Sequence, residues 1–158
     1  MARNTALLAV AATLALLIAG LFTSARGGVP AAAQETLTLI EHVTDEQVVD
    51  LSDEGDSVGD TLVFSNELYD DQNVNLVGRS HGSCMRTVVG ESWDCTFTNT
   101  LENGSLVVTG PFYDDGTGAF AITGGTGDYA GASGQMSLTT AESSTAESPQ
   151  WEFAFEIG

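Results

Sequence analysis

A glycine-rich stretch at residues 119–136, AFAITGGTGDYAGASGQM, limits the fold of this chain more than any other segment. It begins with the β-prone residues Phe120 and Ile122, passes through three closely spaced glycines, and continues into a second apolar segment. Glycine inside a strand typically marks a bend, a bulge or the close approach of another backbone. A small barrel needs such corners, so the stretch predicts two strands joined by a glycine corner. The alternative is a surface loop that tolerates glycine.

The first 33 residues have the layout of a secretory signal peptide. Arg3 precedes an uncharged, largely apolar run at residues 6–22, and three alanines at residues 31–33 supply a cleavage site. Cleavage after Ala33 would leave residues 34–158 as one secreted domain without stable membrane insertion. The alternative is an uncleaved anchor, because the 17 residues of the run are at the short limit of a membrane-spanning helix.

Residues 34–158 are strongly acidic. All 22 Asp and Glu residues lie there against two arginines, Arg79 and Arg86, which gives a formal charge of about −20. Nucleic acids and anionic membrane surfaces would be repelled, so neither is an expected partner. Residues 44–60 are rich in carboxylates but lack the ordered ligand spacing of an EF-hand. We expect a solvated loop there, and no metal or other cofactor.

Two cysteines, Cys84 and Cys95, occur in a chain that we expect in an oxidising compartment. A hairpin turn centred on Val89 and Gly90 would place them directly opposite each other on adjacent strands. They would then be within disulfide reach if they form a non-hydrogen-bonded pair. We therefore expect a Cys84–Cys95 disulfide, and the alternative is two buried free thiols.

Two expected strands each place one polar side chain on an apolar face. Residues 36–43 put Glu41 on the face of Leu37 and Leu39, and residues 61–69 put Asn66 on the face of Phe64. Other segments alternate in the same way, and Asn-Gly at 103–104 predicts a type I′ hairpin turn. The expected strands are residues 36–43, 61–69, 74–88, 92–101, 105–110, 119–123, 133–140 and 150–157.

This pattern predicts an all-β domain. Eight strands with short turns and no helical periodicity are typical of a sandwich or a barrel. We favour a small eight-stranded antiparallel up-and-down β-barrel, because the glycine corner suits a closed sheet. Eight strands enclose enough room for packed side chains or for one small ligand.

Four motifs also suggest a family. They are GDTLVFSNELYD (59–70), the VG and GSC elements within 77–84, LVVTGPF (106–112) and FAITGGTGDYAGASGQM (120–136). Together they resemble the barrel superfamily that joins plant allene oxide cyclases and dirigent proteins, and the last motif is the most specific. The resemblance covers most of residues 34–158 and implies a barrel with a ligand-sized lumen. The plant relatives form trimers or dimers, so a homo-oligomer is compatible with it.

The resemblance also implies site residues. In allene oxide cyclases a first-strand glutamate assists epoxide opening and an asparagine holds a water on the epoxide oxygen; Glu41 and Asn66 match these two positions as catalytic candidates. Val43 replaces a second asparagine of the plant enzymes, and the acidic domain would repel their fatty-acid carboxylate, so allene oxide cyclase activity itself is not expected. The expected ligand pocket consists of Leu62, Phe64, Cys84, Trp93 and Phe97.

Three functions follow as hypotheses. The first is an isomerase, cyclase or dirigent-like guide that orients a small apolar substrate for intramolecular ring closure. The second is a secreted barrel that binds such a molecule without changing it. The third is a structural module whose lumen is filled by its own side chains. Neither His42, expected to point outward, nor His81, expected at the rim, suggests a nucleophile–base pair.

Overall fold

The computed structural model describes residues 34–51 and 54–158, and the expected signal peptide at residues 1–33 lies outside the described residues. No helix in the described part of the chain is long and apolar enough to cross a membrane. The regular structure in this part is β. The strands are β1 (Glu35–His42), β2 (Glu46–Val49), β3 (Thr61–Tyr69), β4 (Leu76–Val88), β5 (Ser92–Leu101), β6 (Gly104–Tyr113), β7 (Gly118–Gly127), β8 (Gly134–Thr140) and β9 (Gln150–Ile157).

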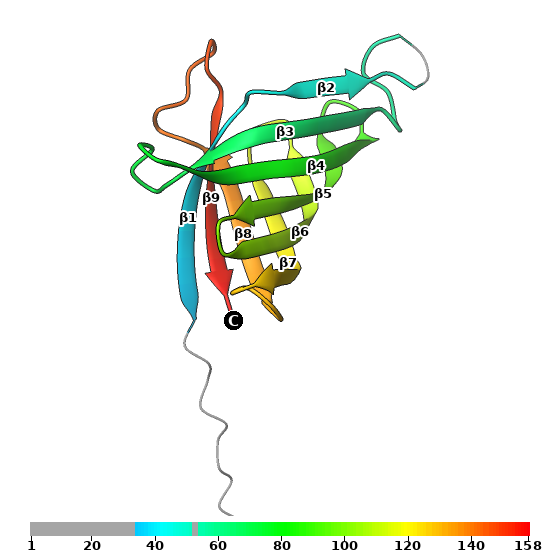
Figure 1. Ribbon diagram of the computed structural model, residues 1–158. Helices are drawn as coiled ribbons and strands as arrows, with labels where there is room; N and C mark the ends of the chain where they lie inside the picture. Colours follow the sequence, from blue (N-terminus) through cyan, green and yellow to red (C-terminus); the bar gives the residue numbers. More distant parts are fainter. Residues whose placement is uncertain (1–33, 52–53) are drawn as a thin grey trace, which may run out of the picture. The chain divides into compact units, whose positions relative to one another are not determined.

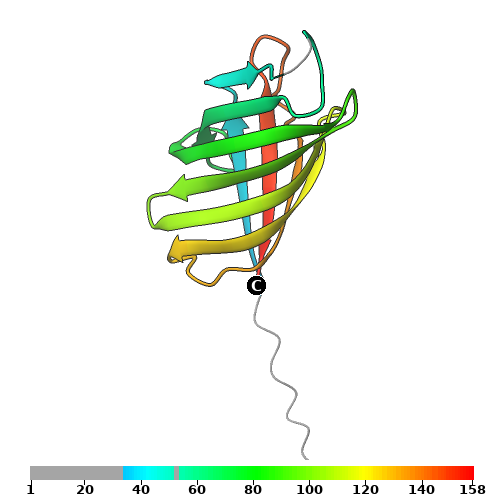
Figure 2. The same ribbon diagram turned by 90° about the vertical axis from the view of Figure 1, so that its right-hand side faces the viewer.

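Eight of these strands form a closed antiparallel barrel, as predicted (Figures 1 and 2). The sheet runs β1-β9-β8-β7-β6-β5-β4-β3, and the ring closes where β1 pairs with β3. This closing ladder covers only three residue pairs, from Ile40 opposite Tyr69 to His42 opposite Glu67. The first half of β1 therefore pairs with β9 on one side only.

The ninth strand, β2, corrects the expectation of a purely irregular loop at residues 44–60. β2 pairs with β3 alone, from Glu46 opposite Phe64 to Val49 opposite Thr61. β1 occupies only the C-terminal end of that edge of β3, so the rest of the edge is free to accept another strand. β2 lies outside the ring as a short edge strand at its rim (Figure 1).

The glycine-rich stretch contains the predicted corner, but the strand does not stop there. β7 continues to Gly127 because a β-bulge absorbs one residue: Val107 pairs with Gly124, whereas Val108 pairs with Ile122. A side chain on Gly125 would collide with the carbonyl oxygens of Ser105 and Tyr129. The expected end of this strand at residue 123 is wrong, since the bulge bends the ladder without breaking it.

The β5–β6 hairpin is present, but its turn is not type I′. Leu101 pairs with Gly104, so the two turn residues are Glu102 and Asn103, and neither has positive φ. A type I′ turn requires positive φ at both central positions. The observed register places Leu106 and Val108 inside the barrel, where both are fully buried.

Aromatic rings fill much of the barrel interior. Phe97 contacts three of them, with ring centroids 5.6 Å from Phe64, 5.1 Å from Phe120 and 5.8 Å from Phe153. Burial of such side chains is the main favourable contribution to folding. The lumen is therefore largely a packed core.

The predicted disulfide is confirmed. Cys84 and Cys95 lie directly opposite each other on β4 and β5, their Cα atoms are 4.0 Å apart, and their sulfurs are bonded. A register shift between Arg86 and Val88 changes only the last pair before the turn. The expected register therefore holds at the cysteines.

Reduction of this disulfide should destabilise the domain. The bond closes a short loop in the unfolded chain, so reduction should lower the free energy of unfolding by roughly 2 to 3 kcal/mol. Urea unfolding with and without reductant measures the change, and a Cys84→Ala/Cys95→Ala double variant controls for other effects of the reductant. An unchanged midpoint in fully reduced wild-type protein would contradict this expectation.

Candidate functional site

Glu41 lies inside the barrel, where the closing ladder places it opposite Leu68. The residue is 4% exposed, and its Oε1 has no hydrogen-bond partner. Burial raises the pKa of Glu41 to about 8; the side chains of Ser80 and Asn66 oppose this change, and the charge of Glu46 adds to it. The carboxyl group is therefore mostly protonated at neutral pH and can donate a hydrogen bond or a proton.

Asn66 is also fully buried, but its amide is largely occupied. Its Oδ1 accepts hydrogen bonds from the backbone N–H groups of Thr44 (2.9 Å) and Asp45 (3.1 Å). Its Nδ2 donates to Oε1 of Glu46 at 3.0 Å. These bonds hold the β1–β2 connection against β3, and they leave one N–H of the amide for any other partner.

A cavity of about 90 Å³ lies beside Glu41. It is smaller than the cavity of roughly 150 Å³ that encloses benzene in an engineered protein. A ring-sized ligand would thus project through the mouth of this cavity or displace its aromatic walls. The lining residues are Glu41, Glu46, Leu62, Phe64, Cys84, Cys95, Phe97, Phe112, Phe120, Leu138, Trp151 and Phe153.

Four of the five expected pocket residues line this cavity, namely Leu62, Phe64, Cys84 and Phe97. Trp93 does not, because its ring lies under the guanidinium group of Arg86, with the Arg86 Cζ 4.1 Å from the ring centroid. Trp93 belongs to the packed core beside the cavity.

The two arginines of residues 34–158 are both engaged elsewhere. Arg86 is 7% exposed and forms ion pairs with Asp56 (2.6 Å) and Asp114 (2.7 Å). Arg79 lies on the outer face, where it is 3.7 Å from Glu67. Neither lines the cavity, whereas the carboxylate of Glu46 does. The mouth is therefore unfavourable for an anion.

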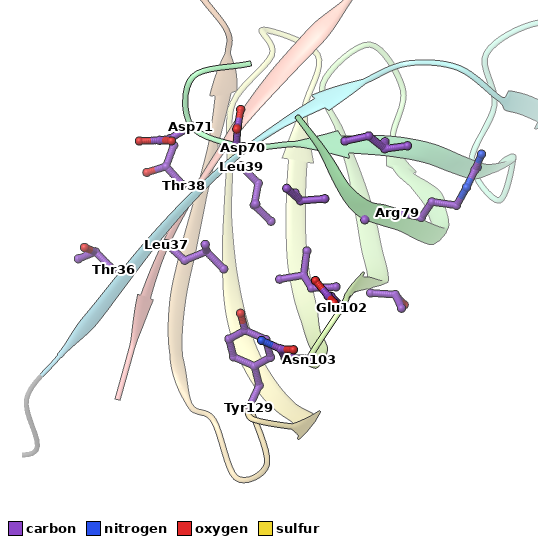
Figure 3. Close-up of a pocket in the computed structure, with 15 residues that line it drawn as sticks. Thr36, Leu37, Thr38, Leu39, Asp70, Asp71, Arg79, Glu102, Asn103 and Tyr129 are labelled. Carbon is purple, nitrogen blue, oxygen red and sulfur yellow. The ribbon is translucent and has the colours of Figure 1, made fainter. Parts of the chain in front are cut away.

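A larger hollow of about 970 Å³, which we call the seam groove, opens beside the first half of β1, where β1 does not pair with β3 (Figure 3). Leu37 and Leu39 face it from β1, and Tyr129 faces it from the β7–β8 connection. Asp70, Asp71 and Glu102 add acidic groups, and Arg79 adds a guanidinium group. The groove is wide and open, and it lacks a buried reactive group, so the smaller cavity with Glu41 is the better candidate site.

The histidines do not contribute to the cavity. His42 stacks on Tyr69 with ring centroids 4.1 Å apart, and its Nε2 is 2.6 Å from Oδ1 of Asn73. His81 is exposed on β4. The described residues contain no group of three or more His, Cys, Asp and Glu side chains arranged to hold a metal ion.

Sequence reasoning missed three residues near Glu41. Glu46 was placed in a solvated loop, although β2 carries it to the mouth of the cavity. Ser80 and Asn99 are fully buried on β4 and β5. The alternation of residues 92–101 does predict that Asn99 shares the face of Trp93, Cys95 and Phe97, but that pattern alone gives Asn99 no functional role.

Comparison with known proteins places these features in a family. Residues 30–155 match the family model for dirigent-like proteins. The structure of a pyocyanin demethylase is 28% identical, covers 75% of this chain and 98% of its own, and has a TM-score of 0.64. A pterocarpan synthase dirigent protein is 17% identical, covers 80% and 95%, and has a TM-score of 0.65. An exo-specific intermolecular Diels–Alderase is 16% identical, covers 79% and 98%, and has a TM-score of 0.56. No curated protein matches the chain significantly.

Replacement of the Glu41 carboxyl group should change how stability depends on pH. A pKa of about 8 in the folded protein, against an ordinary value of 4.5, means that the folded state holds the proton more tightly. The resulting stabilisation is complete below the ordinary pKa and is lost as pH rises through the folded pKa. The stability of Glu41→Gln relative to wild type should therefore rise between these values, by at most about 4 to 5 kcal/mol.

Urea unfolding of both proteins at several pH values measures this difference. Other titrating groups are common to the two proteins and cancel in the comparison. A difference that stays constant across the range would show that Glu41 titrates normally in the folded state.

Proposed function

The chain belongs to the dirigent-like protein family, and we propose that it is a secreted barrel that binds a small, uncharged, largely apolar molecule in its lumen. We further propose that Glu41 acts there as a proton donor in an isomerisation or ring closure. The observation that carries the proposal is the buried Glu41 carboxyl group, with an unpartnered oxygen, at the wall of an aromatic-lined cavity; burial there raises its pKa to about 8.

The proposed reaction conserves protons. Glu41 transfers its proton to a ligand oxygen as the bond between carbon and that oxygen breaks or as the carbonyl becomes an enol. The carboxylate then takes a proton from a carbon or hydroxyl group of the rearranged molecule. No oxidant or reductant is needed, and the aromatic walls supply orientation and exclude water. Asn66 serves in this account as a positioning residue, because it fixes Glu46 and the β1–β2 connection.

The names of the relatives support ring closure as the reaction class. One is a pterocarpan synthase dirigent protein and another is a Diels–Alderase, and both are named for the formation of cyclic products. The pyocyanin demethylase is named for a small organic substrate. These barrels share the fold with the present chain, so a small organic ligand suits this lumen as well.

The negative charge of the domain favours an uncharged ligand over an anionic one. The domain is strongly acidic, Glu46 lies at the mouth, and both arginines of residues 34–158 are engaged away from the cavity. A carboxylate would lose its hydration without gaining a cationic partner. The disulfide supports secretion, because such bonds persist in oxidising compartments.

A second candidate function is a non-catalytic binding or structural module. Two observations favour it: the cavity holds only about 90 Å³, and the amide oxygen of Asn66 is already used by the backbone. On this alternative the buried carboxyl group orients a ligand or remains a silent part of the core.

Ligand entry through the cavity mouth can be tested with a neutral fluorescent probe, N-phenyl-1-naphthylamine. Leu62→Trp should weaken probe binding at least tenfold, because Leu62 lines the cavity. Val63→Trp is the matched control, since the next residue on β3 points outward and is 40% exposed. Equal affinities for both variants and wild type would rule out the lumen as the binding site, and unfolding curves show whether each variant folds.

Catalysis can be tested with the compound that co-purifies with the secreted protein, identified by mass spectrometry. Glu41→Gln should lower its conversion by about a hundredfold or more, because a positioned acid contributes roughly that much. The affinity of the variant for the compound should be kept or increased, since the amide of Gln fits the same space and does not ionise. Full turnover in Glu41→Gln would remove Glu41 from the mechanism, and a bound but unconverted compound would favour the non-catalytic alternative.

A further inference from the structure

Four polar side-chain atoms in the barrel interior have no hydrogen-bond partner. They are Oε1 of Glu41, Oγ of Ser80, and Nδ2 and Oδ1 of Asn99. Ser80 and Asn99 are fully buried. Buried polar groups are nearly always paired in folded proteins, so several unpaired atoms in one place require a physical explanation.

These atoms belong to one layer of the lumen. Asn66, Ser80 and Asn99 lie directly opposite one another on β3, β4 and β5. Glu41 lies opposite Leu68 on β3, the next inward-facing position after Asn66. The Ser80 hydroxyl lies near enough to the carboxyl group to lower its pKa, but the two groups do not have the geometry of a hydrogen bond. We call Glu41, Ser80 and Asn99 the polar row.

The polar row lies next to the cavity, and Glu41 is the member of the row that lines it. Phe97, two residues before Asn99 on the same face of β5, lines the cavity, and Glu41 lines it directly. Ser80 is flanked on its own face by Gly78 and Gly82, so no neighbouring side chain of β4 covers it. Asn99 is thus one inward-facing position beyond the cavity wall on β5, and Ser80 lies directly opposite it on β4.

The polar row offers several hydrogen-bonding functions without a fixed charge. The amide of Asn99 supplies both a donor and an acceptor, and the hydroxyl of Ser80 can act as either. Neither arginine of the domain lies there. The matching ligand group is uncharged and can both donate and accept, as a phenolic hydroxyl, an amide or a hydroxyketone can.

We propose that Ser80 and Asn99, together with Glu41, form a specificity-determining subsite that binds the uncharged polar end of the lumen ligand. This inference rests on the proposed function, because it requires that a small molecule enters the lumen. It adds that the ligand is amphipathic, with an apolar body against the phenylalanine rings and one neutral hydrogen-bonding group at the polar row.

Phenol and toluene form a matched pair of probes for this subsite, since they have similar shape and differ in one polar group. An entirely apolar lumen would favour toluene, whereas the polar row should make phenol bind at least tenfold more tightly. Asn99→Leu, which keeps the branch at Cγ and removes both polar atoms, should weaken phenol binding about tenfold and leave toluene binding unchanged or improved. Thr98→Leu, on the outward face of β5 and outside the lining of both hollows, is the control. Titrations monitored by amide NMR of the full domain give both affinities.

The outcomes separate this inference from the proposed function. Binding of toluene as tightly as phenol would leave the lumen as a ligand site and overturn the polar subsite. Binding of neither probe would overturn both. Structures of crystals soaked in phenol should place its hydroxyl at Asn99 or Ser80; ordered waters there in place of phenol would also contradict the proposal.

Asn99→Leu should unfold at a higher urea concentration than wild type, because it removes an unpaired buried amide. An equal loss of affinity for phenol and for toluene in that variant would show a merely structural role.

Discussion

The short ladder between β1 and β3 determines where the candidate site of this protein lies. Three residue pairs close the ring, and the middle pair sets Glu41 opposite Leu68 in the interior. A shift of one residue would turn Glu41 outward, because side chains alternate between the two faces of a sheet. The same short closure leaves part of the β3 edge for β2, which brings Glu46 to the cavity mouth. It also leaves the first half of β1 paired with β9 alone, so that the other edge of this half lies beside the seam groove.

The distribution of charge complements this geometry. The acidic surface keeps anions away, and the buried Arg86 is neutralised by Asp56 and Asp114. Within the lumen, burial keeps Glu41 protonated, so the carboxyl group contributes a proton without adding charge to an apolar space. A neutral acid among aromatic rings suits uncharged substrates that rearrange without a cofactor. The unpaired atoms of the polar row are a destabilising feature that a ligand would relieve.

Much of this structure could be predicted from local sequence patterns. The alternation of side chains along each strand identified Glu41 and Asn66 as buried. The pairing register of the expected hairpin identified the Cys84–Cys95 pair, and the glycines identified the corner in β7. The errors at β2 and Trp93 depended on contacts between distant segments, whereas those at the β5–β6 turn and the end of β7 depended on the local register of a hairpin. Residues 46–49 become a strand only because an edge of β3 is free, and Trp93 leaves the cavity wall only because Arg86 lies over its ring. The unpaired state of Ser80 and Asn99 required the register of three strands.

The proposed role of Glu41 as a proton donor requires that the barrel holds it as a neutral acid at physiological pH. The most direct measurement is a pH titration of the carboxyl ¹³C chemical shift of Glu41 in glutamate-labelled protein, with the resonance assigned by its absence in Glu41→Gln. If burial holds the proton on Glu41, the titration of its carboxyl group has a midpoint near pH 8 in the folded domain. A midpoint near the ordinary value of 4.5 would mean that Glu41 is charged and hydrated, and it would contradict the proposed role of Glu41 as a proton donor.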